Sequence, residues 1–356
     1  MNHRFGAYWG ALAIVVAVVP LTSGVAAGQA GAAKAKVKKA AATKVWTPPL
    51  TLDGQPDLQG VWLSNSATPL ERPKALEGRE FLTDDEVAEL KKRAARLFQT
   101  GNSDYAAGDN VFLAALANVE QYKNPNATHG SDNMVEREFD NRTSLIVDPP
   151  DGKIPPMTLE AQQRQAATEA RQRLPAGAED MSNALRCITY GVPRLGGNFG
   201  AGPYSYYQIL QSPGYVVLTM EVIHDARIVP LDGRPHLPQS IRQWNGDSRG
   251  RWEGKTLVVD TTNFSPKSNF MGSGENLHLV ERFTRIAPDA IRYEITLSDP
   301  TTWTKPWTAV IPLKRTQDAI YEFACHEGNH AMMLGMLGAA RAGEQVAEEG
   351  AKKAPK

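Results

Sequence analysis

From residue 206 onward, apolar and polar positions alternate in short segments separated by turn-forming clusters. Alternation with a period of two is typical of β-strands that bury one face. Consecutive strands at this spacing favour an antiparallel meander, and this predicts a lipocalin-like barrel or a strongly curved sheet. The predicted strands are 206–212, 215–231, 256–264, 277–286, 291–299, 307–315 and 320–327.

The first half of the chain has a helical pattern after an opening strand at 56–63. LTDDEVAELKKRAARLF (82–98) places apolar residues on one helical face, and its Thr83 and Glu86 predict a capping box. TLEAQQRQAATEARQRL (158–174) predicts a polar, exposed helix. The expected fold class is therefore β-rich α+β, with a helical insert over about 82–175 after the first strand.

Both ends of the chain differ from this body. Residues 1–27 have the basic start, apolar run and small-residue end of a cleaved secretory signal peptide, the alternative being an uncleaved anchor. The apolar run is shorter than the ~20 residues of a spanning helix, so no integral membrane segment is expected after cleavage. Residues 28–45 predict a disordered Ala/Lys linker and residues 340–356 a disordered tail, which leaves a single β-rich domain at 46–339.

Charge and cysteine content narrow the class of protein. Lys+Arg and Asp+Glu both total 39 in 356 residues. The chain therefore lacks the excess of basic residues that would indicate a nucleic-acid partner. The signal peptide predicts a periplasmic or extracellular location. In such an oxidising compartment the two cysteines, Cys187 and Cys325, are expected to form a disulfide, with two free thiols as the alternative.

Strand alternation also identifies ionisable residues on otherwise apolar faces. His224, Glu281 and Glu327 are such residues, and Asp299 ends another apolar face. A histidine beside a carboxylate in an apolar cavity is a workable general acid/base pair, so His224, Glu281 and Glu327 are the candidate catalytic residues. The alternative is that Glu281 pairs with an arginine of a neighbouring strand and that His224 is an ordinary core residue.

A second set of residues is expected to bind ligand, because aromatic side chains at strand ends can line a pocket for a ring-shaped or hydrophobic molecule. This set is Tyr206, Arg227, Trp303 and His326. Alternation from 216 to 228 puts Arg227 on the opposite face from His224. The resulting hypothesis is a secreted protein that takes a small organic molecule into a β-barrel cavity and acts on it by acid/base chemistry. A carrier without chemistry is the alternative.

HEGNH (326–330) matches the H-E-x-x-H pattern of zinc peptidases. That motif needs a helix from its first histidine, so that both histidines share one face. The preceding residues alternate like a strand, and Gly328 disfavours helix by roughly 1 kcal/mol relative to alanine. No cofactor is therefore predicted, and a zinc-dependent hydrolase using HEGNH is kept as a further alternative.

Several longer motifs are similar to those of one protein family. They are RTSLIVDPPDG, HDARIVPLDGRPHLP, GDSRGRWEGKTLVVDTTNF and ACHEGN. Together they resemble a family of uncharacterised secreted bacterial proteins, abundant in acidobacteria and proteobacteria, over about residues 53–341. The resemblance implies export and a shared β-rich body, but no reaction. Its members read CHEGNY where this chain has His330, and residues 109–141 depart from their usual segment.

Overall fold

A computed structural model describes residues 46–99, 110–120, 137–193, 206–268 and 270–353. These belong to one compact unit, Trp46–Lys356. The predicted signal peptide and linker, residues 1–45, lie outside the described residues. A search of the described part of the chain finds no helix with the length and apolar character needed to cross a membrane.

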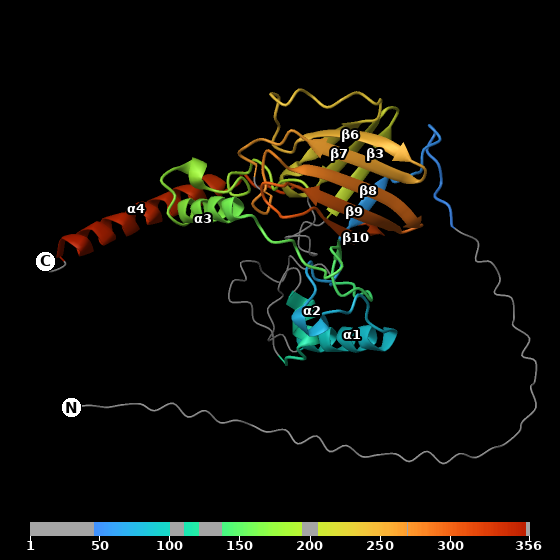
Figure 1. The fold of residues 1–356 in the computed structure, drawn as a ribbon, viewed down its shortest axis with the longest axis horizontal. Helices are drawn as coiled ribbons and strands as arrows, with labels where there is room; N and C mark the ends of the chain where they lie inside the picture. Colours follow the sequence, from blue (N-terminus) through green and yellow to red (C-terminus); the bar gives the residue numbers. More distant parts are fainter. Residues whose placement is uncertain (1–45, 100–109, 121–136, 194–205, 269, 354–356) are drawn as a thin grey trace, which may run out of the picture. The chain divides into compact units, whose positions relative to one another are not determined.

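The described residues form an antiparallel sheet of ten strands (Figure 1). Its strand order is β5-β4-β3-β1-β10-β9-β8-β7-β6, and β2 pairs with β10. Consecutive strands from β3 to β5 and from β6 to β10 are hydrogen-bonded neighbours, which confirms the β-rich antiparallel prediction. The strands are β1 (Gly60–Leu63), β2 (Ile146–Asp148), β3 (Tyr206–Ser212), β4 (Tyr215–Met220), β5 (Ala226–Pro230), β6 (Asp247–Glu253), β7 (Thr256–Thr262), β8 (His278–Ala287), β9 (Ala290–Ser298) and β10 (Trp307–Thr316).

The two edge strands, β5 and β6, approach each other without forming a hydrogen-bonded ladder in the described residues. Gly250 of β6 shows how close they come, because a Cβ atom there would lie 2.5 Å from Leu231 Cδ2 and 2.8 Å from Val229 Cγ1. The sheet is therefore strongly curved, but its hydrogen bonding does not close it into a lipocalin-like barrel.

Alternate residues of the strands fill the concave side of the sheet. Trp62, Phe283, Tyr293 and Trp307 are fully buried there, together with many aliphatic side chains. Phe283 and Tyr293 stack with ring centroids 4.3 Å apart. Each such side chain contributes about 1.5–3 kcal/mol through its removal from water, so this packed interior is the main source of stability.

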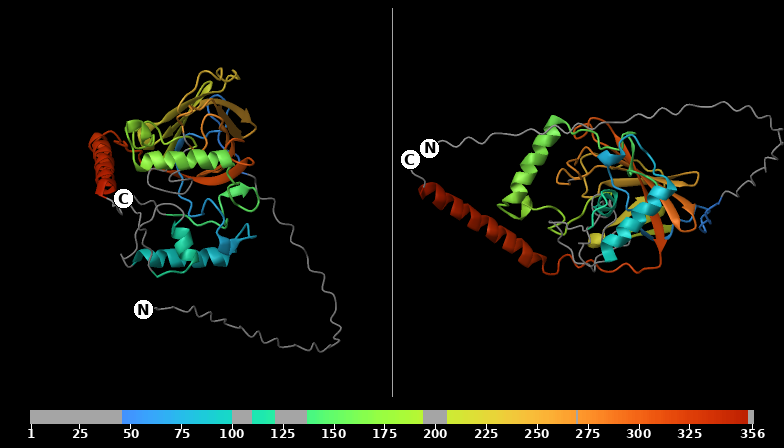
Figure 2. Two further views of the ribbon diagram at one scale, coloured as in Figure 1. Left: turned by 60° about the vertical axis from the view of Figure 1, so that its left-hand side comes forward. Right: turned by 90° about the horizontal axis from the view of Figure 1, so that it is seen from below.

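The helices can be followed by colour in Figure 2. In α1, Thr83 and Glu86 form the predicted capping box: Thr83 N donates to the Glu86 carboxylate at 2.8 Å, and Glu86 N donates to Thr83 Oγ1 at 3.3 Å. Leu90 of α1 and Phe112 of α2 bury their side chains in a second, smaller core. The helices are α1 (Asp84–Gln99), α2 (Asn110–Leu116), α3 (Leu159–Arg173) and α4 (Asn329–Lys353), with single turns of 3-10 helix at Lys74–Leu76, Ala178–Asp180 and Val222–His224.

Some predictions of local structure are wrong. Residues 320–327 form no strand, and β10, the strand before them, pairs with β9, β1 and β2 instead. Residues 340–353, predicted as part of a disordered tail, continue α4. Their Ala, Glu and Lys content is low in apolar groups but strong in helix propensity, so composition alone misleads here.

Candidate functional site

The candidate catalytic residue Glu281 lies in the interior, as predicted, but its carboxylate is fully engaged. It is 0% exposed and accepts hydrogen bonds from Arg227 Nη1 at 2.6 Å and Nη2 at 2.8 Å. The Tyr293 hydroxyl donates to it as well. Burial raises the pKa of Tyr293 well above its usual value, and the Glu281 charge raises it further. Glu281 is thus the acceptor at the centre of a buried polar cluster.

The arginine in this cluster comes from a segment whose facing was predicted wrongly. Residues 215–231 are not one strand, because β4 ends at Met220 and β5 starts at Ala226. The turn between them includes Ile223 in a left-handed conformation, with φ of 57°. As a result the inward positions of β5 are odd-numbered: Arg227 is 6% exposed, whereas Ile228 is 66% exposed. Burial opposes the charge on Arg227, but Glu281 outweighs it and raises the pKa of Arg227.

Two of the three candidate catalytic residues lie in different environments. Glu327 is exposed in the turn that precedes α4, whereas Glu281 is fully buried. The backbone of His224 ends the 3-10 turn between β4 and β5 and is not part of a strand. The catalytic roles of these residues remain predictions.

The candidate ligand-binding aromatics have structural partners. Tyr206 lies on the outer face of β3, and its hydroxyl donates to Asp318 at 3.2 Å. Burial raises the pKa of Tyr206, and the Asp318 charge adds to the effect. Trp303 is 1% exposed and packs edge to face on Trp307, with ring centroids 5.6 Å apart.

The predicted disulfide is confirmed, since Cys187 and Cys325 are bonded with their Cα atoms 5.8 Å apart. HEGNH follows directly after it. His326 and Glu327 are exposed in a turn, Gly328 has φ of +73°, and His330 lies in α4. The two histidines are therefore not on one helical face as the zinc motif requires. Across the described residues, no group of three or more His, Cys, Asp or Glu side chains is placed to hold a metal ion.

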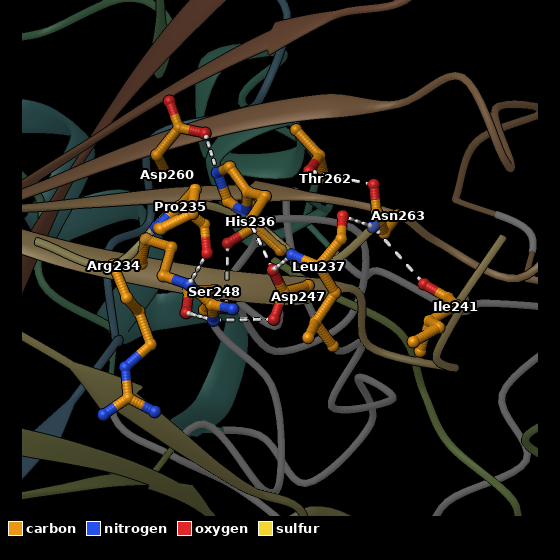
Figure 3. Close-up of polar contacts among 12 residues, drawn as sticks. Arg234, Pro235, His236, Leu237, Ile241, Asp247, Ser248, Asp260, Thr262 and Asn263 are labelled. Atoms are coloured by element: carbon orange, nitrogen blue, oxygen red, sulfur yellow. Dashed lines mark hydrogen bonds and ion pairs between the residues drawn. The ribbon is translucent and has the colours of Figure 1, made fainter. Parts of the chain in front are cut away.

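A histidine that the sequence did not single out, His236, lies at the centre of the polar network in Figure 3. Its Nδ1 is 2.9 Å from Asp247 Oδ2, and its Nε2 is 2.9 Å from Asp260 Oδ1. Asp247 also accepts from Leu237 N at 3.0 Å and from Arg249 Nη1 at 2.6 Å. Both ring nitrogens of His236 are therefore engaged by carboxylates.

Strand register explains why these side chains meet. Arg249 and Asp260 are directly paired across β6 and β7, and Asp247 lies two residues earlier on the same face. This is the outer face of the sheet, and residues 234–243 fold back over it. His278, at the start of β8, adds a hydrogen bond from its ring to Asp260 Oδ2 at 3.0 Å. That bond raises the pKa of His278.

The covering segment is held at its other end by Asn263. The Asn263 amide donates to the carbonyls of Leu237 at 2.8 Å and Pro238 at 3.2 Å. Gln243 then bonds to the backbone on both sides of Phe264. Trp244, which follows directly, is thereby fixed beside Phe264. The network around His236 therefore holds in place the segment that leads to Trp244.

Trp244 and Phe264 line a cavity of about 950 Å³. Phe270 belongs to the same wall, which also includes polar residues such as Lys267, Ser268 and Asn276. One face of α3 forms another wall and is polar, with Arg164, Gln165, Thr168 and Arg171. Residues 179–192, between α3 and β3, complete the lining. A cavity of this size with mixed aromatic and polar walls has the dimensions of small-molecule sites.

Sequence reasoning missed this cavity. The motif GDSRGRWEGKTLVVDTTNF carried a signal only for the neighbouring network, because it contains Asp247 and Asp260, which the hairpin of β6 and β7 places on one face. Comparison of the chain with protein-family models gives no match, and comparison with curated proteins gives none either.

Proposed function

We propose that this protein binds a small organic molecule in the cavity between α3 and residues 244–277, and that it works outside the cytoplasm. The observation that carries the proposal is the cavity itself, about 950 Å³ in volume with aromatic residues in one wall and a polar helix in another. Pockets of this kind bury most of a ligand's apolar surface and orient it through a few polar groups. The predicted signal peptide and the disulfide between Cys187 and Cys325 support an oxidising location.

The same observations favour a carrier over an enzyme. The predicted acid/base chemistry needs a free carboxylate inside the sheet, yet Glu281 is engaged by Arg227 and Tyr293. The expected position of the ligand site also differs from that in a lipocalin. The proposed ligand site lies beside α3 and is lined by residues outside the strands, whereas the concave interior that a lipocalin would use is filled by buried side chains.

Two adjacent alanines of α3 give a matched test. Ala166 and Ala167 are both exposed, but only Ala167 lines the cavity. Ala167→Trp is expected to weaken binding of the neutral fluorescent probe N-phenylnaphthylamine several-fold, because the indole occupies ligand space. Ala166→Trp is expected to bind it like the wild type. Titration of the full chain without its signal peptide measures both.

Equal binding by the two variants would overturn the proposal, since the probe would then be bound elsewhere. Melting temperatures of both variants check that each is folded. Mass spectrometry of protein purified from its native host gives an independent test, because a carrier is expected to retain a stoichiometric organic ligand that Ala167→Trp loses.

A further inference from the structure

We propose that the ligand of this cavity is an organic anion, an aromatic or alicyclic body that carries a carboxylate or sulfonate group. This inference rests on the proposed function and names the chemical class of the ligand. It follows from which polar groups of the lining are already engaged and which keep unused hydrogen-bonding capacity.

The acidic groups of the lining are mostly occupied by protein partners. Asp299 accepts from the hydroxyls of Ser273 at 2.6 Å and Thr302 at 2.7 Å, and also from Thr301. Glu179 pairs with Arg186 at 2.9 Å. Asp180 accepts two backbone N–H groups and Glu275 pairs with Arg242. Glu160 lies in the first turn of α3, where the helix dipole favours a negative charge. These acids leave little capacity for a cationic ligand.

Two arginines of α3 differ from this pattern. Arg164 and Arg171 are two helical turns apart, so they lie on the same face, about 10 Å apart along the axis. Among the described residues neither has a carboxylate within ion-pairing distance. Arg164 Nη2 donates to Thr301 O at 2.9 Å, and Arg171 Nη2 donates to Thr168 Oγ1 at 3.2 Å. Each guanidinium has five N–H donors, so most of them remain free for an anion.

A third arginine adds a positive group to the cavity wall. The side chain of Arg186 is only 10% exposed and lines the cavity. Two of its nitrogens bond to Glu179 and Asn183, which hold the guanidinium in place. Its Nε has almost no accessible surface, so a ligand reaches only the rest of this side chain.

The opposite wall defines the rest of the ligand. Trp244 and Phe270 are partly exposed aromatic side chains in this lining, which suits a ring or another apolar body, whereas Phe264 is buried in the core. The formal charges of the residues around the cavity sum to zero when Arg242 is included. The expected selectivity for an anion therefore comes from the oriented arginine donors and not from a net positive charge. A ligand that satisfies both walls is apolar at one end and anionic at the other.

Two probes with the same aromatic body test this. Anilinonaphthalene sulfonate is anionic, whereas N-phenylnaphthylamine is its neutral counterpart. The wild-type chain is expected to bind the sulfonate about tenfold more tightly. Arg164→Gln/Arg171→Gln is expected to lose that preference while keeping its affinity for the neutral probe. Arg173→Gln is the control for each of the two single substitutions, Arg164→Gln and Arg171→Gln, because it also removes one positive charge from α3 but lies outside the cavity lining.

The outcomes separate this inference from the proposed function. If Ala167→Trp weakens both probes but the sulfonate has no advantage in the wild type, the cavity function stands and the anion inference is overturned. A loss of sulfonate affinity in Arg173→Gln equal to that in each single substitution also overturns it, because the effect is then general surface charge. If Ala167→Trp and Ala166→Trp bind both probes alike, the cavity function itself fails.

Discussion

Glu281 of β8 and Arg227 of β5 face each other across the interior of the sheet, with both carboxylate oxygens 2.6–2.8 Å from the terminal guanidinium nitrogens. Their side chains are 0% and 5% exposed. β5 and β8 are not neighbours in the sheet order, so the pair connects one edge strand to the opposite wall. Removing one member of such a pair leaves the charge of the other member buried and unpaired in a medium that solvates it poorly.

Glu281→Gln is therefore expected to lower the free energy of unfolding by about 3–5 kcal/mol, because Arg227 keeps its charge without a counterion. Denaturant-induced unfolding of the wild type and the variant measures this. Arg227→Met combined with Glu281→Leu is expected to recover much of the loss, since similar-sized apolar groups then fill the space.

A control for this pair is available on the same strand. Arg282, the next residue, pairs with Glu253 on the exposed outer face at 2.7 Å. Glu253→Gln removes the same kind of charge but leaves its partner in water, so a far smaller loss is expected. Equal losses in Glu281→Gln and Glu253→Gln would contradict the role assigned to the buried pair.

The sequence predicted one member of the buried pair but not the other. Alternation within 277–283 placed Glu281 inside because β8 is regular over that stretch. Arg227 was assigned to the wrong face because the chain turns between Met220 and Ala226, which shifts the inward positions from even to odd numbers. Alternation cannot detect such a shift when apolar residues continue through the turn. The strand predicted at 320–327 failed for a different reason: periodicity does not show which sheet positions are already taken.

Less of the candidate site than of the fold could be predicted from the sequence. His236 and Asp260 are 24 residues apart, and they meet only through strand register and the folding back of residues 234–243. The cavity walls come from α3, from residues 179–192 and from residues 244–277, which are distant in the sequence. Periodicity reports which face of an element is buried, but it carries no information about which elements enclose a space.

Gly250 tests how closely the edge strands approach. A Cβ atom at this position would lie 2.5 Å from Leu231 Cδ2 and 2.8 Å from Val229 Cγ1. Gly250→Ala is therefore expected to lower stability by about 1–3 kcal/mol, the usual cost of overpacking. Gly335→Ala in α4 is the control, because no atom lies within 4 Å of the added methyl group and alanine favours helix. Thermal unfolding measures both variants. An unchanged melting temperature of Gly250→Ala would show that the edge strands are farther apart than the structure places them.

His278 predicts a pH dependence of stability. Its hydrogen bond to Asp260 raises the pKa of His278. Burial raises the pKa of Asp260, but the bonds from His278 and His236 outweigh it and lower that pKa overall. A histidine with a raised pKa in the folded state stabilises fully below its unfolded value of about 6.5 and loses this contribution as pH rises through the folded value. The carboxylate contribution is lost at the other end, as pH falls through the lowered pKa of Asp260.

The advantage of the wild type over His278→Gln is therefore expected to be largest at about pH 5–6 and to shrink above neutrality. It should stay below about 1 kcal/mol because the His278 side chain is half exposed and water screens the pair. Denaturant unfolding at a series of pH values measures it, with His330→Gln, at an exposed position of α4, as the control for loss of a surface histidine. NMR titration of the His278 ring adds a direct test: its pKa should fall in Asp260→Asn. A stability advantage of the wild type that grows with pH would show that Asp260 does not stabilise the charged form of His278. A ring pKa that is unchanged in Asp260→Asn would show the same.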